Sequence, residues 1–114
     1  MGDCLFCRIV AKEIPATVVA EDDELLAFKD INPQAPIHLL IIPKRHIANT
    51  AASEAGDEAL LGRLLRFGCR AAGEAGVAES GFRLVLNNGP DSGEAVPHLH
   101  LHVLGGRRLA WPPG

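Results

Sequence analysis

The stretch His98-Leu99-His100-Leu101-His102-Val103-Leu104 places three of the five histidines of this chain at alternate positions. Alternate side chains of a β-strand point to one face, so the imidazoles are predicted to form one row, with Leu99, Leu101 and Val103 packed behind it. Neighbours in such a row are roughly 6.6 Å apart, at about 3.3 Å of rise per residue. One zinc ion with Zn–N bonds near ~2 Å cannot bind all three from a regular strand. The row therefore indicates three histidines with separate roles.

Length and composition predict a single domain spanning residues 1–114 with a packed interior. The chain has 114 residues, of which 47% are hydrophobic, enough for one core. A net charge of −3, few aromatic residues and no long basic run argue against nucleic-acid binding. The longest apolar run, Leu39 to Pro43, is too short to cross a bilayer, and the N-terminus does not resemble a signal peptide. We therefore expect a cytoplasmic protein without membrane contact.

Hydrophobic periodicity and turn residues predict an α+β fold with both helices on one face of a five-stranded, mainly antiparallel sheet. Strands are expected at residues 17–20, 25–29, 38–42, 82–87 and 98–104. The run 38–42 is apolar enough for a strand buried on both faces.

Two helices are expected, one short and one long. Asp3 is expected to cap the short helix, which runs to Lys12. The long helix is expected to run from Ser53 to about Ala75, with Gly76 as its C-terminal cap. Its buried stripe is predicted to contain Leu60, Leu61, Leu64, Leu65, Cys69 and Ala72. Cys69 is therefore interpreted as a core or interface residue and not as a nucleophile.

The chemistry favoured by the histidine row is acyl or phosphoryl transfer. Imidazole has a reference pKa of about 6.5 and is a good nucleophile toward phosphorus. His100, in the middle, could attack while its neighbours donate hydrogen bonds to phosphate oxygens. The loop from Asn88 to Pro97, with two glycines and two prolines, could turn backbone N–H groups toward an anion. The sequence contains neither a carboxylate pair near the row nor a P-loop motif, which argues against a glycosidase and excludes a P-loop ATPase.

The segment Cys4-Leu5-Phe6-Cys7 is a C-x-x-C motif, which by itself is compatible with a zinc site, a redox pair or chance. An odd total of three cysteines and the absence of a secretory signal favour reduced thiols or metal ligands over disulfides.

The histidine row and several other motifs together resemble the histidine triad (HIT) family of nucleotide-binding proteins. The segments that carry the resemblance, in family order, are residues 30–38, residues 42–46, Asn87 with its glycine loop, and residues 98–104. The C-terminal segment Gly105 to Gly114 is similar to the tail of the Hint branch of that family.

The resemblance implies a purine nucleotide-binding hydrolase, similar to nucleoside phosphoramidases, that forms a nucleotidyl-histidine intermediate. It implies that His100 is the nucleophile, that His102 contacts the phosphoryl oxygens and that His38 supports proton transfer. The implied nucleotide-binding residues, besides His100 and His102, are Leu5, Phe6, Ile9, Phe28, Asp30, Ile31, Asn87, Gly93 and Ala95. For the five apolar residues among them, plain core packing is the alternative.

The resemblance also implies a structural zinc site and a homodimer. In bacterial-type members the ligands match Cys4, Cys7, His46 and His98. The expected dimer interface includes the long helix and residues 82–87, with Trp111 reaching toward the other subunit's site. Two positions depart from the Hint pattern: Ala95 replaces a serine, and Glu94 replaces a frequent glutamine close to the expected phosphate.

Three other functions are alternatives to the nucleotide hydrolase that the resemblance implies. A dinucleoside polyphosphate hydrolase shares the triad but differs in its C-terminal region. Nucleotidyl transfer to a sugar phosphate is disfavoured because those enzymes resemble a doubled domain. A zinc-stabilised nucleotide sensor without turnover is compatible with Ala95.

Overall fold

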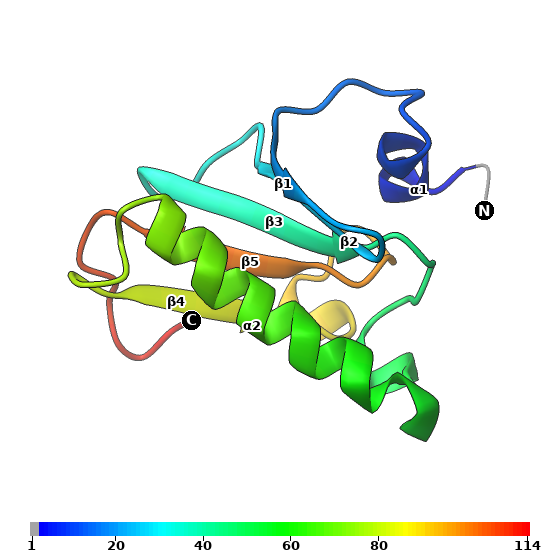
Figure 1. Ribbon diagram of the computed structural model, residues 1–114. Coiled ribbons are helices and arrows are strands. Elements are labelled where there is room, and N and C mark those ends of the chain that lie inside the picture. The colour runs from blue at the N-terminus through cyan, green and yellow to red at the C-terminus, as the bar shows by residue number, and fades with distance from the viewer. Residues whose placement is uncertain (1–2) are drawn as a thin grey trace.

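All five strands form one antiparallel sheet in the computed structural model, which describes residues 3–114 (Figure 1). The sheet order is β1-β2-β3-β5-β4, and every neighbouring pair is antiparallel. The strands are β1 (Val18–Glu21), β2 (Leu25–Lys29), β3 (Ile37–Pro43), β4 (Phe82–Leu86) and β5 (Leu101–Gly105). The helices are α1 (Leu5–Val10) and α2 (Glu58–Glu74), with short 3-10 turns at Thr50–Ala52, Ala55–Asp57 and Pro90–Ser92. The predicted α+β class is confirmed. No helix within residues 3–114 is long and apolar enough to cross a membrane.

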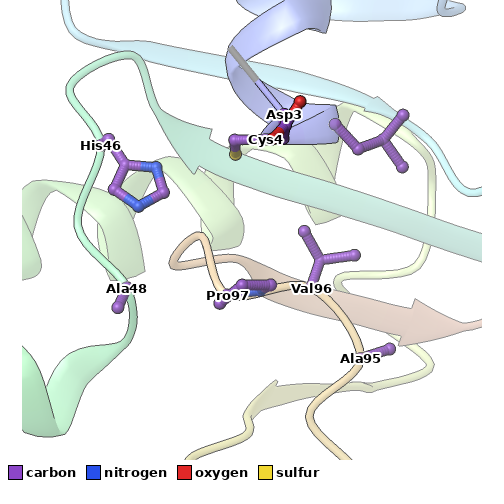
Figure 2. Close-up of a pocket in the computed structure, with 8 residues that line it drawn as sticks. Asp3, Cys4, His46, Ala48, Ala95, Val96 and Pro97 are labelled. Atoms are coloured by element: carbon purple, nitrogen blue, oxygen red, sulfur yellow. The ribbon is translucent and has the colours of Figure 1, made fainter. Parts of the chain in front are cut away.

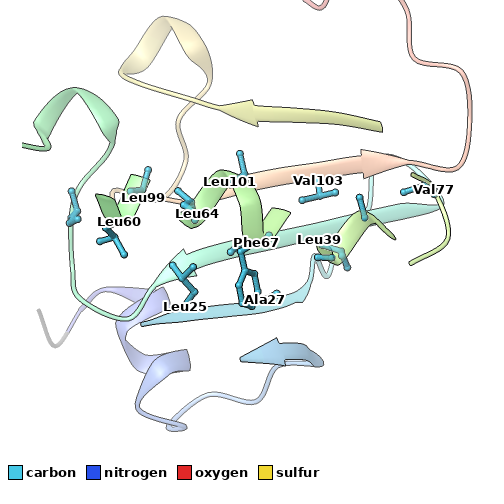
Figure 3. Close-up of a cluster of buried hydrophobic side chains, with 14 residues drawn as sticks. Leu25, Ala27, Leu39, Leu60, Leu64, Phe67, Val77, Leu99, Leu101 and Val103 are labelled. Atoms are coloured by element: carbon cyan, nitrogen blue, oxygen red, sulfur yellow. The ribbon is translucent and has the colours of Figure 1, made fainter. Parts of the chain in front are cut away.

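The two helices lie on opposite faces of the sheet, so the prediction that they share one face is wrong. The long helix α2 covers the face that carries the larger hydrophobic cluster (Figure 3). Phe6 of α1 packs on the other face, in a cluster with Leu26, Phe28, Leu40 and Ile42. Strands β2 and β3 are apolar at successive positions and not only at alternate ones, so each needs a cover on both faces.

The packing of α2 differs from its predicted stripe in one important way. Leu60, Leu64 and Ala72 are buried as expected, together with Phe67, Gly68 and Ala71. Leu61 is partly buried, whereas Leu65 and Cys69 are exposed. The core reading of Cys69 is therefore wrong for the single chain. The contact with the sheet is centred on Phe67 and Gly68, and that rotates Cys69 out to solvent.

Local hydrogen bonds and one glycine determine where α2 begins and ends. The α-helix begins at Glu58 and not at Ser53, because two 3-10 turns precede it and the carboxylate of Asp57 accepts from the Glu54 amide. The C-terminal end is as predicted. Gly76 has φ +85°, its N–H donates to Gly73, and the Val77 N–H donates to the carbonyl of Ala72. These paired bonds are the Schellman motif, which favours glycine at that position.

The histidine row does not lie on one regular strand. β5 begins at Leu101, so the prediction of a strand from His98 is wrong for its first three residues. The segment before β5 is held by other bonds, with the Leu99 N–H donating to the carbonyl of Ile47 at 2.6 Å. The alternation nevertheless persists. Leu99, Leu101 and Val103 join the cluster under α2, as predicted, and the histidines turn to the opposite face.

Candidate active site and metal centre

His38 and His102 are joined by a short hydrogen bond on the face of the sheet opposite α2. Leu40 of β3 pairs with His102 of β5, so His38, two residues earlier on β3, is the diagonal neighbour on the same face. The distance from His38 Nε2 to His102 Nδ1 is 2.9 Å, and Asp30 Oδ2 is 3.3 Å from the same Nε2. The tertiary structure thus brings together three predicted site residues that are far apart in the chain.

Backbone groups determine which ring nitrogens carry protons. The Gln34 amide donates to His38 Nδ1 at 3.0 Å, so in neutral His38 the proton is on Nε2. That N–H donates to His102 Nδ1, and the proton of neutral His102 is therefore on its own Nε2. His102 consequently presents a hydrogen-bond donor to the site.

His100 has the opposite tautomer. Its Nδ1 is 2.7 Å from the carbonyl oxygen of His98, which can only accept, so Nδ1 carries the proton. Its Nε2 has no hydrogen-bond partner within residues 3–114. Every fully buried side-chain nitrogen in that part of the chain does have a partner, so the Nε2 of His100 must be accessible to solvent. The rings of His100 and His102 are neighbours, with centroids 5.0 Å apart. An unprotonated nucleophilic nitrogen therefore lies beside a donor.

Burial keeps the paired histidines neutral. It lowers the pKa of His102 to about 4, and repulsion from His100 and His38 adds to that shift. Burial also lowers the pKa of His38, although the Asp30 carboxylate opposes the shift. At neutral pH both rings are therefore uncharged, as the tautomers above require.

The glycine loop is fixed by side chains that were not predicted. Gly93 has φ +83°, a conformation that favours glycine. Glu94 accepts hydrogen bonds from the Asn49 side chain at 2.8 Å and from the Gly89 amide at 3.1 Å, and these bonds lower its pKa. Glu94 thus holds its own loop closed. Asn87 directly follows β4, two residues after Val85, which pairs with His102, so continued pairing would place Asn87 opposite His100.

The five apolar residues of the predicted purine slot divide into two groups. Phe6 and Phe28 are each only 4% exposed and pack edge to face, so they belong to the core. Ile9 is partly buried against the same cluster. Leu5 is 44% exposed and Ile31 is 99% exposed, so these two can offer free apolar surface to a ligand.

The four predicted metal ligands come together in one cluster. Cys4 Sγ is 3.3 Å from His98 Nδ1, and Cys7 Sγ is 3.3 Å from His46 Nδ1. The two Nδ1 atoms are 3.2 Å apart, and all four ligand atoms lie within 4.8 Å of one another. A tetrahedral zinc site with Zn–N near 2.0–2.1 Å and Zn–S near 2.3 Å has edges of roughly 3.3 to 3.8 Å. The cluster could therefore hold a metal of that kind.

Hydrogen bonds around the cluster leave its ligand atoms available to a metal. His98 Nε2 donates to the carbonyl of Pro43 at 2.8 Å, which leaves the Nδ1 lone pair free for a cation. Cys4 is the N-cap of α1 and accepts from the Cys7 amide, so the prediction that Asp3 caps this helix is wrong. In the protein alone, burial and the neighbouring Cys4 raise the pKa of Cys7. A bound cation would hold both thiols as thiolates.

A cavity of about 450 Å³ opens beside the cluster (Figure 2). Three chain segments line it, namely Asp3 to Leu5, His46 with Ala48, and Ala95 to Pro97. Its lining thus includes two candidate metal ligands and the Ala95 position. No sequence motif predicted this cavity, because segments distant in the chain line it. The hydrogen bonds to the Pro43 and His98 carbonyls were also missed, because a backbone carbonyl is the same in every residue.

The chain is similar in sequence and fold to known proteins of one family. The model of the HIT domain family matches residues 11–109. The chain is 49% identical over 112 residues to an Arabidopsis thaliana protein named adenylylsulfatase HINT1, covering 96% of this chain and 76% of that protein. It is 47% identical over 114 residues to a 14 kDa zinc-binding protein of Brassica juncea, covering 98% and 100%. The crystal structure of a HIT family hydrolase from Legionella pneumophila has a TM-score of 0.96 and 53% identity, covering 98% of this chain and 100% of that one.

Proposed function

The chain belongs to the HIT family, and on that premise we propose that it hydrolyses purine nucleoside 5′-phosphoramidates or related nucleotide conjugates through a nucleotidyl intermediate on His100. Its similarity to a HIT family hydrolase and to a relative named as an adenylylsulfatase supports hydrolysis of a nucleotide conjugate. The observation that carries the proposal is the pair of opposite tautomers, with a free Nε2 lone pair on His100 beside an Nε2 donor on His102.

The reaction follows from these tautomers. His100 Nε2 forms a bond to phosphorus while the bond from phosphorus to the leaving group breaks. The leaving group departs with the electron pair of that bond, and an amine takes up a proton from water as it leaves. The positive charge that develops on the His100 ring is stabilised because its Nδ1–H already donates to the His98 carbonyl. The His102 Nε2–H donates to a phosphoryl oxygen, and His38 keeps that donor oriented. Water then breaks the bond between His100 and phosphorus and releases the nucleoside monophosphate.

Nucleotide binding is proposed for the residues around this pair. The partly buried Asp30 carboxylate is suited to accept hydrogen bonds from ribose hydroxyls, and Leu5 and Ile31 offer apolar surface to a purine. Phe6, Ile9 and Phe28 would support that surface from below. Asn87, Gly93 and the Ala95 backbone are proposed to lie around the phosphate.

A structural zinc ion is proposed for the cluster of Cys4, Cys7, His46 and His98. The closeness of the four ligand atoms, all within 4.8 Å of one another, supports it, and so does similarity to a protein named as zinc-binding. When bound, the ion would tie α1 to the segment before β5. About one zinc per chain is expected in protein purified without chelator, and replacing both cysteines by serine should abolish it. Metal-free protein, or unchanged zinc in that variant, would contradict this assignment.

The decisive experiment compares wild type with His100→Ala on an adenosine phosphoramidate. Loss of the nucleophile should lower turnover by at least ~10³ while AMP binding survives. His102→Ala is the partner variant, because it removes the Nε2–H donor but leaves the nucleophile. Acid-quenched wild type should carry a nucleotidyl group on His100. Near-normal turnover by His100→Ala would falsify the assignment, and AMP binding without turnover by wild type would favour the sensor.

A further inference from the structure

Cys4 and Cys7 are placed to react with each other as well as to bind a metal. Their Sγ atoms belong to one cluster with all ligand atoms within 4.8 Å, and the Cys7 amide donates to Cys4 Sγ at 3.4 Å. The C-x-x-C spacing permits a disulfide between them after small side-chain rotations. We propose that this pair is a redox-sensitive site, in which a peroxide converts the two metal-binding thiols into a disulfide, frees the metal and loosens His98 and His100.

Access to the pair comes from the cavity beside it. Cys4 and His46 line that cavity of about 450 Å³ (Figure 2). Cys4 and Cys7 are both only half-buried. A molecule as small as hydrogen peroxide can therefore reach Cys4 without unfolding the chain. The third cysteine, Cys69, is exposed on α2 and has no place in the cluster.

The oxidation balances with hydrogen peroxide as the only oxidant. The Cys4 thiolate attacks one peroxide oxygen, becomes a sulfenic acid and releases hydroxide. The Cys7 thiolate then attacks the Cys4 sulfur, forms the S–S bond and releases the second hydroxide. Two electrons pass from the sulfur pair to the O–O bond. Neither sulfur of the disulfide remains a thiolate ligand, so two of the four metal bonds are lost, and a reducing dithiol reverses the change.

The consequence reaches His100 through two direct contacts. His98 is fully buried, and its carbonyl is the group that accepts from His100 Nδ1 at 2.7 Å. Phe6, which lies between the two cysteines in sequence, packs edge to face on His98 and His100 with centroids 5.9 and 5.1 Å away. Loss of the metal leaves the buried His98 Nδ1 without its cation, and rearrangement of the C-x-x-C segment shifts Phe6. Both effects disturb the orientation of His100.

The test treats metal-loaded wild type with hydrogen peroxide and follows thiols, metal, stability and turnover. Free thiols should fall from three to one per chain, and one metal should be released to a chromogenic chelator. Mass spectrometry should find a Cys4–Cys7 disulfide. The melting temperature should fall by about 5 °C or more, as expected for a loss of about 1 kcal/mol. Turnover should fall at least about tenfold because His100 is misplaced. Dithiothreitol with added zinc should restore all four.

Cys69→Ser is the matched control, because it removes the exposed thiol and leaves the cluster intact. It should lose its two remaining thiols and its metal as wild type does. A disulfide that includes Cys69, peroxide treatment that spares Cys4 and Cys7, or oxidation that dithiothreitol does not reverse would overturn the proposal, as would protein that binds no metal. The thiol, metal and melting measurements need no substrate, so this test stands apart from that of the proposed hydrolysis.

Discussion

At the scale of single residues, the site is defined by hydrogen bonds to backbone groups. The Gln34 amide and the His98 carbonyl give His102 and His100 opposite tautomers, although both are histidines of one motif. Two histidines of one motif thus expose different atoms, an Nε2–H donor on His102 and a free Nε2 lone pair on His100, because their backbone partners differ.

Ala95 provides a prediction about the leaving group. Its methyl group lines the cavity beside the cluster of Cys4, Cys7, His46 and His98 and cannot donate a hydrogen bond. An amine leaving group needs a proton as it departs, whereas an acidic one such as sulfate leaves as an anion. Ala95→Ser should therefore raise turnover of an adenosine phosphoramidate by roughly tenfold, about 1.4 kcal/mol, and change that of adenylyl sulfate much less. Ala95→Gly, which adds no hydroxyl, is the control. Equal effects on both substrates would contradict this expectation.

His102 provides a prediction about pH. Because burial lowers its pKa from 6.5 to about 4, the unfolded chain takes up the proton first as pH falls. Its contribution to stability is complete above about pH 6.5 and disappears as pH falls toward 4. Between pH 7.5 and pH 5, the free energy of unfolding of wild type should fall by about 2 kcal/mol more than that of His102→Gln. Denaturant titrations across this range give the two slopes. Any loss of metal at low pH is the same in both proteins, so it does not change the difference between their curves. Parallel curves of unfolding free energy against pH would contradict the role of His102.

At the scale of elements, the distance between α2 and the sheet depends on one glycine. A Cβ on Gly68 would lie 2.7 Å from Leu101 Cδ2 and 3.3 Å from Leu84 Cδ2. Leu101 is completely buried, so it has little room to withdraw. The close approach allows strand β5, which carries His102, to pack directly under the helix.

Gly68→Ala should therefore lower the free energy of unfolding by about 1–3 kcal/mol, as expected for overpacking. Gly62→Ala is the matched control in the same helix, because nothing lies within 4 Å of its Cβ. The control should be neutral or gain up to about 1 kcal/mol from helix propensity. Urea denaturation of both variants compares them. A Gly68→Ala protein as stable as the control would show that the core can adjust.

At the scale of the whole molecule, two surfaces are available for a second copy of the chain. Strand β4 is an edge strand that pairs only with β5, and Leu65 on α2 is 42% exposed. Edge strands and exposed apolar helix faces are commonly covered in oligomers. Trp111 is 81% exposed near the C-terminal end, where it could reach a partner's site.

We expect a homodimer, with a light-scattering mass twice that of the 12.1 kDa chain. Leu65→Glu should shift it to the monomer at micromolar concentration, because a charge would replace a buried apolar contact. Val19→Glu is the control, since Val19 is similarly exposed at 44% but lies on β1, at the other edge of the sheet. A monomeric wild type, or dissociation by Val19→Glu alone, would contradict this interface.

Truncation before Arg107 should change leaving-group preference more than AMP affinity.

Local patterns in the sequence were enough to predict the class of fold, the positions of the strands within a few residues and the order of the site motifs. It also predicted Gly76 at the end of α2 and that Cys4, Cys7, His46 and His98 come together. These features depend on local properties, namely periodicity, backbone freedom and ligand chemistry, that each residue carries with it.

Four features follow from contacts made in the folded chain: the start of β5, the face that α1 covers, the exposure of Cys69 and the tautomers of His100 and His102. Each of these depends on a partner distant in the chain, such as the Ile47 carbonyl for Leu99 or the Pro43 carbonyl for His98. Backbone groups are the same in every residue but proline, so their pairings leave no trace in sequence. They exist only once the sheet has brought the segments together.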